Sequence, residues 1–520
     1  MKMISFNNSN IFLKKALGLV VLSALVLGSF SCNKELEVKP SRYTVDKNHW
    51  KSIDDAKSGI FGMYGLMRTA ITSDNLHWLM GDLRQGDFVA TSRPDLKAII
   101  NGQLNASYPV LNEITNWRKF YAVINSTSLF IERSREIVEA DKRYTPVNNN
   151  VDVAQARALR AFAYFYMVRI WGDVPLLTSS HDGNFEQHDR TAQAKVLAFA
   201  ESELILAAKV LPYYYGGTDP QLPGEYFGIT AQGLNGVLFT KISAYALLAH
   251  VSAWQGRYID TEIYTKFIMD NYTKGDGYGP RYINMDELTG TGSGSPFAYK
   301  RGTIIVGFSS EYGNGESTAN GHIEQLTLAQ PLVQKIRPDI YVPKEVIAAA
   351  FTDRKDLRFG LDTITKIHRT PYFVNFTTDM PIFKKIAILA NGGSAGSFAI
   401  FSSTALFTRL EELTLLRAEA LAVIGQRTDA IANLNIVLSQ RGVAAIEALS
   451  TKDLIDEIFA ERRRELMGEG WRWYDLIRYN KIKGTNPDFN KLITEKGIYW
   501  PISKDVINAN PMITQNTYWK

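Results

Sequence analysis

The chain has little cysteine, little histidine and no large excess of one charge, and each shortage excludes a class of function. Cys32 is the only cysteine in 520 residues, so no internal disulfide can form and no cysteine is left for catalysis. The seven histidines form no H-E-x-x-H motif, and the sequence predicts neither a metal site nor a cofactor. With 58 basic and 53 acidic residues, the chain lacks the concentrated positive charge of a nucleic-acid binder.

Long apolar runs are also scarce, and the one that stands out is near the N-terminus. Residues 16–27 are apolar, follow Lys14 and Lys15, and precede the small residues of 28–31. This order predicts a secretory signal, and the run is too short to span a bilayer, which needs roughly 20 residues. Residues 1–31 carry three lysines and no acid, so their removal leaves a net charge of +2.

Cys32 directly follows this segment. Residues 29–32, Ser-Phe-Ser-Cys, resemble the lipobox of a bacterial lipoprotein signal, although the usual leucine three positions before the cysteine is missing. The resemblance implies a thiol that carries acyl chains and a lipid-anchored tether over residues 32–50. The acidic stretch 33–37 resembles an export signal of Bacteroidetes surface lipoproteins. An ordinary secretory signal and a plain hydrophilic tether are the alternatives.

Apolar spacing predicts a mostly helical chain. Ser52 and Asp55 match a capping box ahead of a helix, and further helices are expected over 117–137, 153–170 and 191–211. The helix at 153–170 is apolar on several sides, which is typical of a buried helix. It should end at the Gly-Asp-Val-Pro of residues 172–175.

Two later segments share one pattern of small residues. Residues 241–270 and 411–440 each contain Leu, Ala and Ala at the same distances before a glycine, Gly256 in one and Gly425 in the other. Small residues let two helices approach closely, and the glycine suits a tight turn. Each segment resembles a tetratricopeptide helical hairpin. Two ordinary helix pairs are the alternative.

The middle of the chain is different. Residues 273–326 are rich in glycine, serine and tyrosine, and residues 360–403 contain short β-like runs such as 385–389. Residues 392–396 match the G-x-S-x-G motif of hydrolases around Ser394. Because that fold needs a histidine after the serine, and the last histidine is His368, we interpret the motif as a hairpin turn and predict no enzyme.

The last 70 residues contain an arginine-rich segment. Ser450 is expected to cap a helix with Asp453, and residues 461–466 read Glu-Arg-Arg-Arg-Glu-Leu. Acids flank the arginines at helical spacing, so ion pairing within the helix is predicted rather than a phosphate-binding patch.

The chain resembles the SusD/RagB family of Bacteroidetes outer-membrane lipoproteins over nearly all of its mature length. The features that carry the resemblance occur in order. They are the lipobox cysteine, residues 156–165 (Ala-Arg-Ala-Leu-Arg-Ala-Phe-Ala-Tyr-Phe), Trp-Gly-Asp-Val-Pro at 171–175, Arg-Ala-Glu-Ala at 417–420, Glu-Arg-Arg-Arg-Glu-Leu at 461–466, Trp-Tyr-Asp-Leu at 473–476 and Trp-Pro-Ile at 500–502.

The resemblance implies one mostly α-helical domain over residues 51–520. Four tetratricopeptide-like helix pairs would form a scaffold, about 154–272 and 411–480, beside a loop-rich binding region with minor β structure, about 70–115 and 273–405. It further implies a lipid-anchored outer-membrane protein that faces the exterior. Such a protein captures oligosaccharides as the lid of a partner SusC-like TonB-dependent transporter. A relative that captures peptides is the alternative.

A sugar-binding surface needs exposed aromatic rings for the C–H face of the sugar and polar groups for its hydroxyls. Two places in the sequence offer this mixture. The candidate ligand-binding residues are Trp78, Asp82, Arg84, Asp87, Tyr278, Tyr282, Tyr299 and Tyr312. A core position for Trp78 and loop packing for the tyrosines are the alternatives. No residue is predicted to bind a metal or to act in catalysis.

Overall fold

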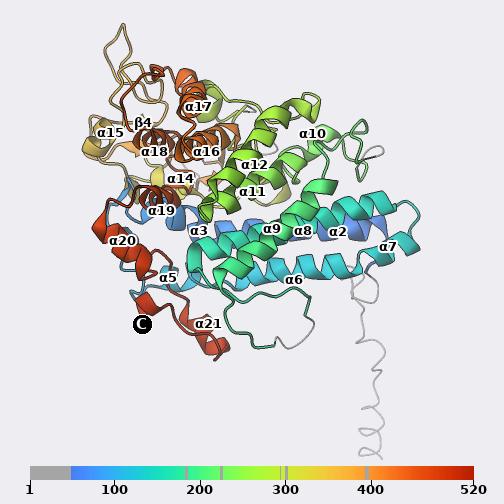
Figure 1. Cartoon of the computed structure of the whole chain (residues 1–520). Helices are drawn as coiled ribbons and strands as arrows, with labels where there is room; N and C mark the ends of the chain where they lie inside the picture. Colours follow the sequence, from blue (N-terminus) through green and yellow to red (C-terminus); the bar gives the residue numbers. More distant parts are fainter. Residues whose placement is uncertain (1–48, 182–185, 223–225, 293, 299–301, 393–397) are drawn as a thin grey trace, which may run out of the picture. The chain divides into compact units, whose positions relative to one another are not determined.

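The computed structural model describes residues 49–181, 186–222, 226–292, 294–298, 302–392 and 398–520. Residues Trp50–Lys520 form one compact unit (Figure 1). Helices make up most of it and the strands are short, so the predicted mostly α-helical class is confirmed. No helix in the described part of the chain is long and apolar enough to cross a bilayer.

The described residues form ten longer helices. They are α2 (Ile53–Thr72), α6 (Arg118–Arg133), α8 (Pro146–Trp171), α9 (Gln193–Val210), α11 (Lys241–Trp254), α12 (Tyr258–Asn271), α16 (Leu410–Val423), α17 (Arg427–Gln440), α18 (Leu454–Glu465) and α19 (Arg472–Lys483). The shorter ones are α3 (Leu76–Trp78), α4 (Pro94–Ile100), α5 (Pro109–Ile114), α7 (Arg135–Ala140), α10 (Ala231–Leu234), α13 (Met285–Thr289), α14 (Ile323–Thr327), α15 (Lys344–Ala350), α20 (Pro487–Thr494) and α21 (Lys504–Ala509). Single turns of 3-10 or π helix are η2 (Ser73–Asn75), η3 (Leu79–Leu83), η4 (Tyr272–Gly275), η5 (Tyr312–Asn314) and η6 (Thr517–Trp519).

The strands pair only two at a time, always antiparallel. The pairs are β1 (Val89–Ala90) with β3 (Ile340–Tyr341), β2 (Val306–Phe308) with β8 (Ala405–Thr408), β4 (Phe373–Val374) with β5 (Ile382–Phe383), and β6 (Leu389–Asn391) with β7 (Ile400–Phe401). Such short pairs cannot form a core of their own, so their stability depends on packing against helices.

The long helices pack in an array. α8 packs on α9, α9 on α11, α11 on α12, α12 on α16, α16 on α17 and α18, and α18 on α19. Figure 1 shows this succession from α8 and α9 through α11 and α12 to α16, α17 and α18. The array contains α11 with α12 and α16 with α17, the two pairs that the residue pattern predicts, and α8 with α9 and α18 with α19, which bring the number to the four that the resemblance implies.

Local signals explain where the scaffold helices begin and end. Ser52 and Asp55 form the predicted capping box of α2. Gly256 and Gly425 have φ angles of +77° and +84° and follow the first helix of their pairs, a conformation that suits glycine. Helix α8 begins earlier than predicted because Thr145 caps it, and nearly all its residues after 150 are buried.

Three predictions about local structure need correction. Asp453, rather than Ser450, caps α18, because its carboxylate accepts the N–H groups of Ile455 and Asp456. The β-like run 385–389 contributes only its last residue to β6. The regions expected as loops, 70–115 in particular, contain several short helices.

The G-x-S-x-G segment lies between β6 and β7, which pair antiparallel. A strand on each side is the arrangement of a hairpin and differs from the strand–turn–helix of a hydrolase. Ser394 itself lies outside the described residues.

Candidate functional site

The predicted aromatic platform at Trp78 is in the core. Trp78 is 3% exposed, and its ring lies 5.3 Å from that of His77 and 6.3 Å from that of His322. The short helix α3 directs this side chain inward, so no ring face is open to a sugar. The structure corrects the expectation of a platform here and agrees with the core alternative.

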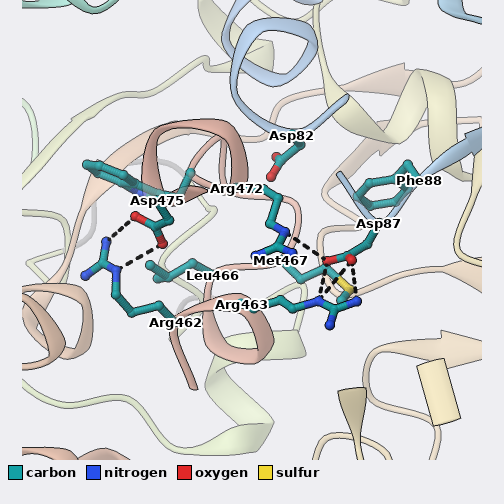
Figure 2. A pocket seen from close by; sticks show the side chains of 10 residues that line it. Asp82, Asp87, Phe88, Arg462, Arg463, Leu466, Met467, Arg472 and Asp475 are labelled. Carbon is teal, nitrogen blue, oxygen red and sulfur yellow. Dashed lines mark hydrogen bonds and ion pairs between the residues drawn. The ribbon is translucent and has the colours of Figure 1, made fainter. Parts of the chain in front are cut away.

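The carboxylates of Asp82 and Asp87, near Trp78 in the sequence, are hydrogen-bonded to α18 and to the turn before α19. Asp87 is 8% exposed, and its carboxylate accepts hydrogen bonds from Nε and Nη2 of Arg463 at 2.9 and 2.5 Å. Asp82 accepts the Gly470 N–H at 2.6 Å, and Arg472 lies beside both acids (Figure 2). The space between these side chains is about 10 Å³, which holds no more than one water molecule. These residues join the N-terminal segment to α18 and α19, and they present no sugar-sized site.

Arg84 is also structural. Its guanidinium donates to the backbone carbonyls of Gly497 and Ile498 at 2.6 and 3.1 Å, and lies 4.1 Å from the centroid of the Trp473 ring. The side chain is 2% exposed, so it has no access to a ligand. Its expected role in sugar binding is therefore corrected as well.

The buried carboxyl of Asp82 has a raised pKa. Burial raises its pKa to about 7, although the Gly470 N–H and the Lys385 ammonium favour the charged form. Because this pKa is higher in the folded chain than in the unfolded chain, the folded chain binds more protons between pH 4 and 7. Asp82 therefore reduces stability as the pH rises through this window.

Replacing Asp82 with asparagine should remove this part of the pH dependence. The amide does not titrate, and its oxygen can still accept the Gly470 N–H. We expect the free energy of unfolding of Asp82→Asn relative to wild type to increase by about 2 kcal/mol between pH 5 and pH 8. Urea unfolding at both pH values measures it, with exposed Asp488→Asn as the control. Parallel pH profiles for wild type and Asp82→Asn would contradict the assignment.

The tyrosines of the middle region differ in their exposure to solvent. Tyr278 and Tyr312 are 42% and 53% exposed. Tyr282 is partly buried, and its hydroxyl lies 2.9 Å from that of Thr414, so it packs the loop against α16. Tyr299 lies outside the described residues. Two rings of the predicted group are therefore open to solvent.

A cavity of about 330 Å³ lies beside η5, which carries Tyr312. It is bounded by α2, by α10 and the residues around it, and by the segment that follows β2. The partly buried Phe61 supplies aromatic surface, Phe308 lies behind it at 3% exposure, and Arg68, Asn314 and Glu316 supply polar groups.

The polar edge of this cavity is organised by Arg68. Its guanidinium donates to the Ser309 carbonyl at 3.0 Å and pairs with the Glu316 carboxylate at 2.8 Å. Both side chains remain about a quarter exposed, at 24% and 26%, so a ligand can reach them. The sequence prediction missed Phe61, Arg68 and Glu316. The available signal was a second stripe of α2, residues 61, 65 and 68, beside the apolar stripe that forms the core.

Two other cavities are less suited to a sugar. One of about 760 Å³ between α15, α17 and α18 has no aromatic lining residue. One of about 500 Å³ between the start of α6 and α21 includes Trp117, which is only 4% exposed, and Tyr121, whose hydroxyl donates to the Pro175 carbonyl. No group of three or more His, Cys, Asp or Glu side chains suited to a metal ion occurs among the described residues.

Two family models match the chain. A model described as "SusD family" matches residues 374–519, which include α16 to α19. A model described as "Starch-binding associating with outer membrane" matches residues 85–221, which include α8 and α9.

Individual relatives match almost the full length. The SusD-like protein P38 of Formosa agariphila is 27% identical over 96% of this chain and 97% of its own. The crystal structure of a SusD superfamily protein from Bacteroides thetaiotaomicron is 45% identical, with a TM-score of 0.82 over 91% of this chain and all of that chain. A SusD homolog from the same organism, 22% identical with a TM-score of 0.72, covers 90% of this chain and 99% of its own, and shares the fold.

Proposed function

This chain belongs to the SusD/RagB family, and we propose that it is a cell-surface lipoprotein that captures oligosaccharides and delivers them to a partner SusC-like TonB-dependent transporter. The match to a family described as starch-binding and associating with the outer membrane supports a glycan ligand and this location. The role proposed is binding, without catalysis.

One observation carries the glycan part of the proposal. The cavity beside η5 combines the partly buried ring of Phe61 with a guanidinium, a carboxylate and an amide. A sugar ring stacks its C–H face on an aromatic ring, and its hydroxyls accept from an arginine and donate to a carboxylate. We assign this cavity as the primary ligand site, with the exposed ring of Tyr312, two residues before the lining residue Asn314, as a further candidate contact.

The attachment and the partner are also proposals. Cys32 and the acidic stretch 33–37 lie outside the described residues, and we propose that the lipidated cysteine holds the protein on the outer face of the outer membrane. A tether of this kind keeps a capture protein near its transporter, which raises the effective concentration of one for the other.

Alanine at Tyr312 or at Arg68 should weaken glycan binding about tenfold. The first change removes a stacking surface and the second removes a donor and the partner of Glu316. Isothermal titration calorimetry against a panel of soluble polysaccharides and peptides measures the effect. The protein is the chain from residue 33 onward, which keeps the whole compact unit Trp50–Lys520. Tyr518→Ala is the matched control. Tyr518 is 40% exposed and belongs to η6, none of whose residues lines the cavity, whereas Tyr312 belongs to η5, whose Asn314 does.

Calorimetry against this panel also distinguishes a glycan ligand from a peptide ligand. Binding of one glycan class that weakens in both variants, but not in the control, supports the proposal. Binding of peptides alone would overturn the glycan ligand. Glycan binding that neither variant changes would place the primary site elsewhere.

A further inference from the structure

A second aromatic group lies outside the cavity, where the segment after α9 meets the end of α12. The rings of Tyr214 and Tyr278 stack in parallel, with their centroids 6.1 Å apart and 15° between their planes. Tyr214 is 6% exposed and Tyr278 is 42% exposed. Tyr278 is therefore an exposed ring stacked against a buried one, the arrangement expected of a stacking platform.

Two lysines lie beside the ring of Tyr213, the residue before Tyr214. The ammonium nitrogens of Lys241 and Lys274 are 5.5 and 5.3 Å from the centroid of the Tyr213 ring. Lys241 is the first residue of α11, so the positive end of that helix dipole lies nearby. Within the described residues, neither ammonium has a carboxylate oxygen within 4.0 Å.

The acids close to these lysines already have partners. The carboxylate of Asp219 accepts the N–H groups of Tyr213 and Gln221 at 2.8 and 2.9 Å. Asp276 faces the hydroxyl of Tyr214. The local backbone and side chains thus satisfy the negative groups, while the two ammonium groups are left without direct counter-ions.

The protonation of Lys241 agrees with this geometry. Burial lowers the pKa of Lys241, and the nearby Lys274 lowers it further, while Asp219 acts in the opposite direction. A bound anion would compensate both positive charges and form charge-assisted hydrogen bonds with them.

We propose that Tyr213, Tyr278, Lys241 and Lys274 form a second sugar subsite that takes a negatively charged residue of the glycan, a carboxylated or sulfated sugar. The inference rests on the proposed glycan function and names the class of glycan. In this subsite the sugar ring stacks on Tyr278, and its anionic group binds Lys241 and Lys274 beside the Tyr213 ring. An anion without the sugar ring would lack the stacking contact.

One stretch of chain, residues 226–241, connects the primary cavity with the first lysine of the subsite. The N–H of Lys241 donates to the Pro212 carbonyl at 2.8 Å, and the rings of Tyr215 and Tyr226 lie 5.2 Å apart. Residues between Tyr226 and Lys241 also line the cavity beside Tyr312.

The test compares three hexasaccharides: a neutral one, a hexagalacturonate and a sulfated galactan hexasaccharide. We expect the chain from residue 33 onward to bind at least one charged probe about tenfold more tightly than the neutral one. Lys241→Gln/Lys274→Gln should remove this preference, and Lys241→Arg/Lys274→Arg should keep most of it, because arginine retains the charge. The control Lys97→Gln/Lys195→Gln makes the same change in net charge at exposed positions away from the ring.

Each outcome has a distinct meaning. Loss of the preference in the glutamine pair alone, with thermal unfolding unchanged, supports the subsite. Equal binding of charged and neutral probes, or a preference that the glutamine pair keeps, overturns it. Neutral binding that depends on Tyr312 but not on the lysines leaves the proposed function standing without the subsite. Failure of every glycan to bind overturns both.

Discussion

Glu465→Ala should destabilise the folded chain by about 3–5 kcal/mol, because it removes the shared counter-ion of three buried arginines. The Glu465 carboxylate accepts from Nε and Nη2 of Arg441, both at 2.8 Å, and lies 2.9 Å from Nη2 of Arg409 and 3.1 Å from Nη1 of Arg358. All four side chains are 0% exposed. Without the acid, the arginine charges remain buried and incompletely paired, and that is the origin of the loss.

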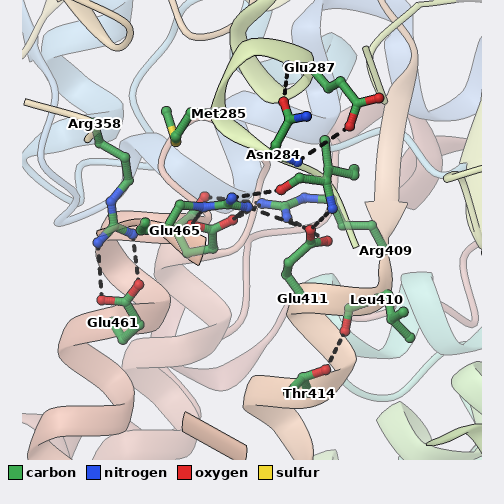
Figure 3. A network of polar contacts seen from close by, with 12 residues as sticks. Asn284, Met285, Glu287, Arg358, Arg409, Leu410, Glu411, Thr414, Glu461 and Glu465 are labelled. Atoms are coloured by element: carbon green, nitrogen blue, oxygen red, sulfur yellow. Dashed lines mark hydrogen bonds and ion pairs between the residues drawn. The ribbon is translucent and has the colours of Figure 1, made fainter. Parts of the chain in front are cut away.

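The surrounding network shows which arginine depends most on Glu465. Figure 3 shows Arg358 also held by Glu461, and Arg409 beside Glu411, so each arginine has further partners. Arg441 has the weakest alternative, since Glu411 is 3.5 Å away. Burial opposes the charged form of Glu465, but the guanidinium groups outweigh it and hold the pKa of Glu465 well below its usual range. The charged state is therefore kept at all physiological pH values.

The matched control is on the same helix. Glu457 pairs with Lys452 at 3.6 Å, and its side chain is 31% exposed. Glu457→Ala should change the free energy of unfolding by less than about 0.5 kcal/mol, as is usual for a surface ion pair. Urea unfolding monitored by circular dichroism measures both variants. If Glu465→Ala lost less than about 1 kcal/mol, the network would not depend on this acid.

Gly81→Ala should destabilise the chain by about 3 kcal/mol, the upper range for overpacking a core. A Cβ at Gly81 would lie 2.0 Å from the carbonyl oxygen of Gly470 and 2.6 Å from its Cα. Both contacts are with backbone, which cannot rotate away as a side chain can. The contact is where η3 meets α19, next to the hydrogen bond from Gly470 to Asp82.

Gly62→Ala is the control for the glycine prediction. Gly62 is exposed in α2, and a Cβ there would have no atom within 4 Å. Alanine should stabilise that helix by about 0.5–1 kcal/mol, because glycine is a poor helix former. Thermal unfolding of both variants measures the two opposite shifts. A neutral Gly81→Ala would mean that η3 and the Gly470 turn can separate without loss.

Most of the helical scaffold could be predicted because its signals are local. The capping box at Ser52 and the turn glycines Gly256 and Gly425 act within a few residues of their own positions. Ion pairing of the arginine-rich segment was right for Arg464, which pairs with Glu461 on the same helix. Arg462 and Arg463 instead reach Asp475 and Asp87.

The sequence by itself determined the helical class, the positions of the helix pairs and the family. These follow from apolar period, capping residues and short motifs, each of which is complete within one segment. Only the tertiary structure decided which aromatic and charged side chains are exposed. Asp87 and Arg463 are 376 residues apart, and Arg84 and Gly497 are 413 apart, so no local pattern shows that they meet. Burial depends on such distant partners. In the folded chain the N-terminal candidates are core residues, whereas Tyr278 and Tyr312 are at the surface.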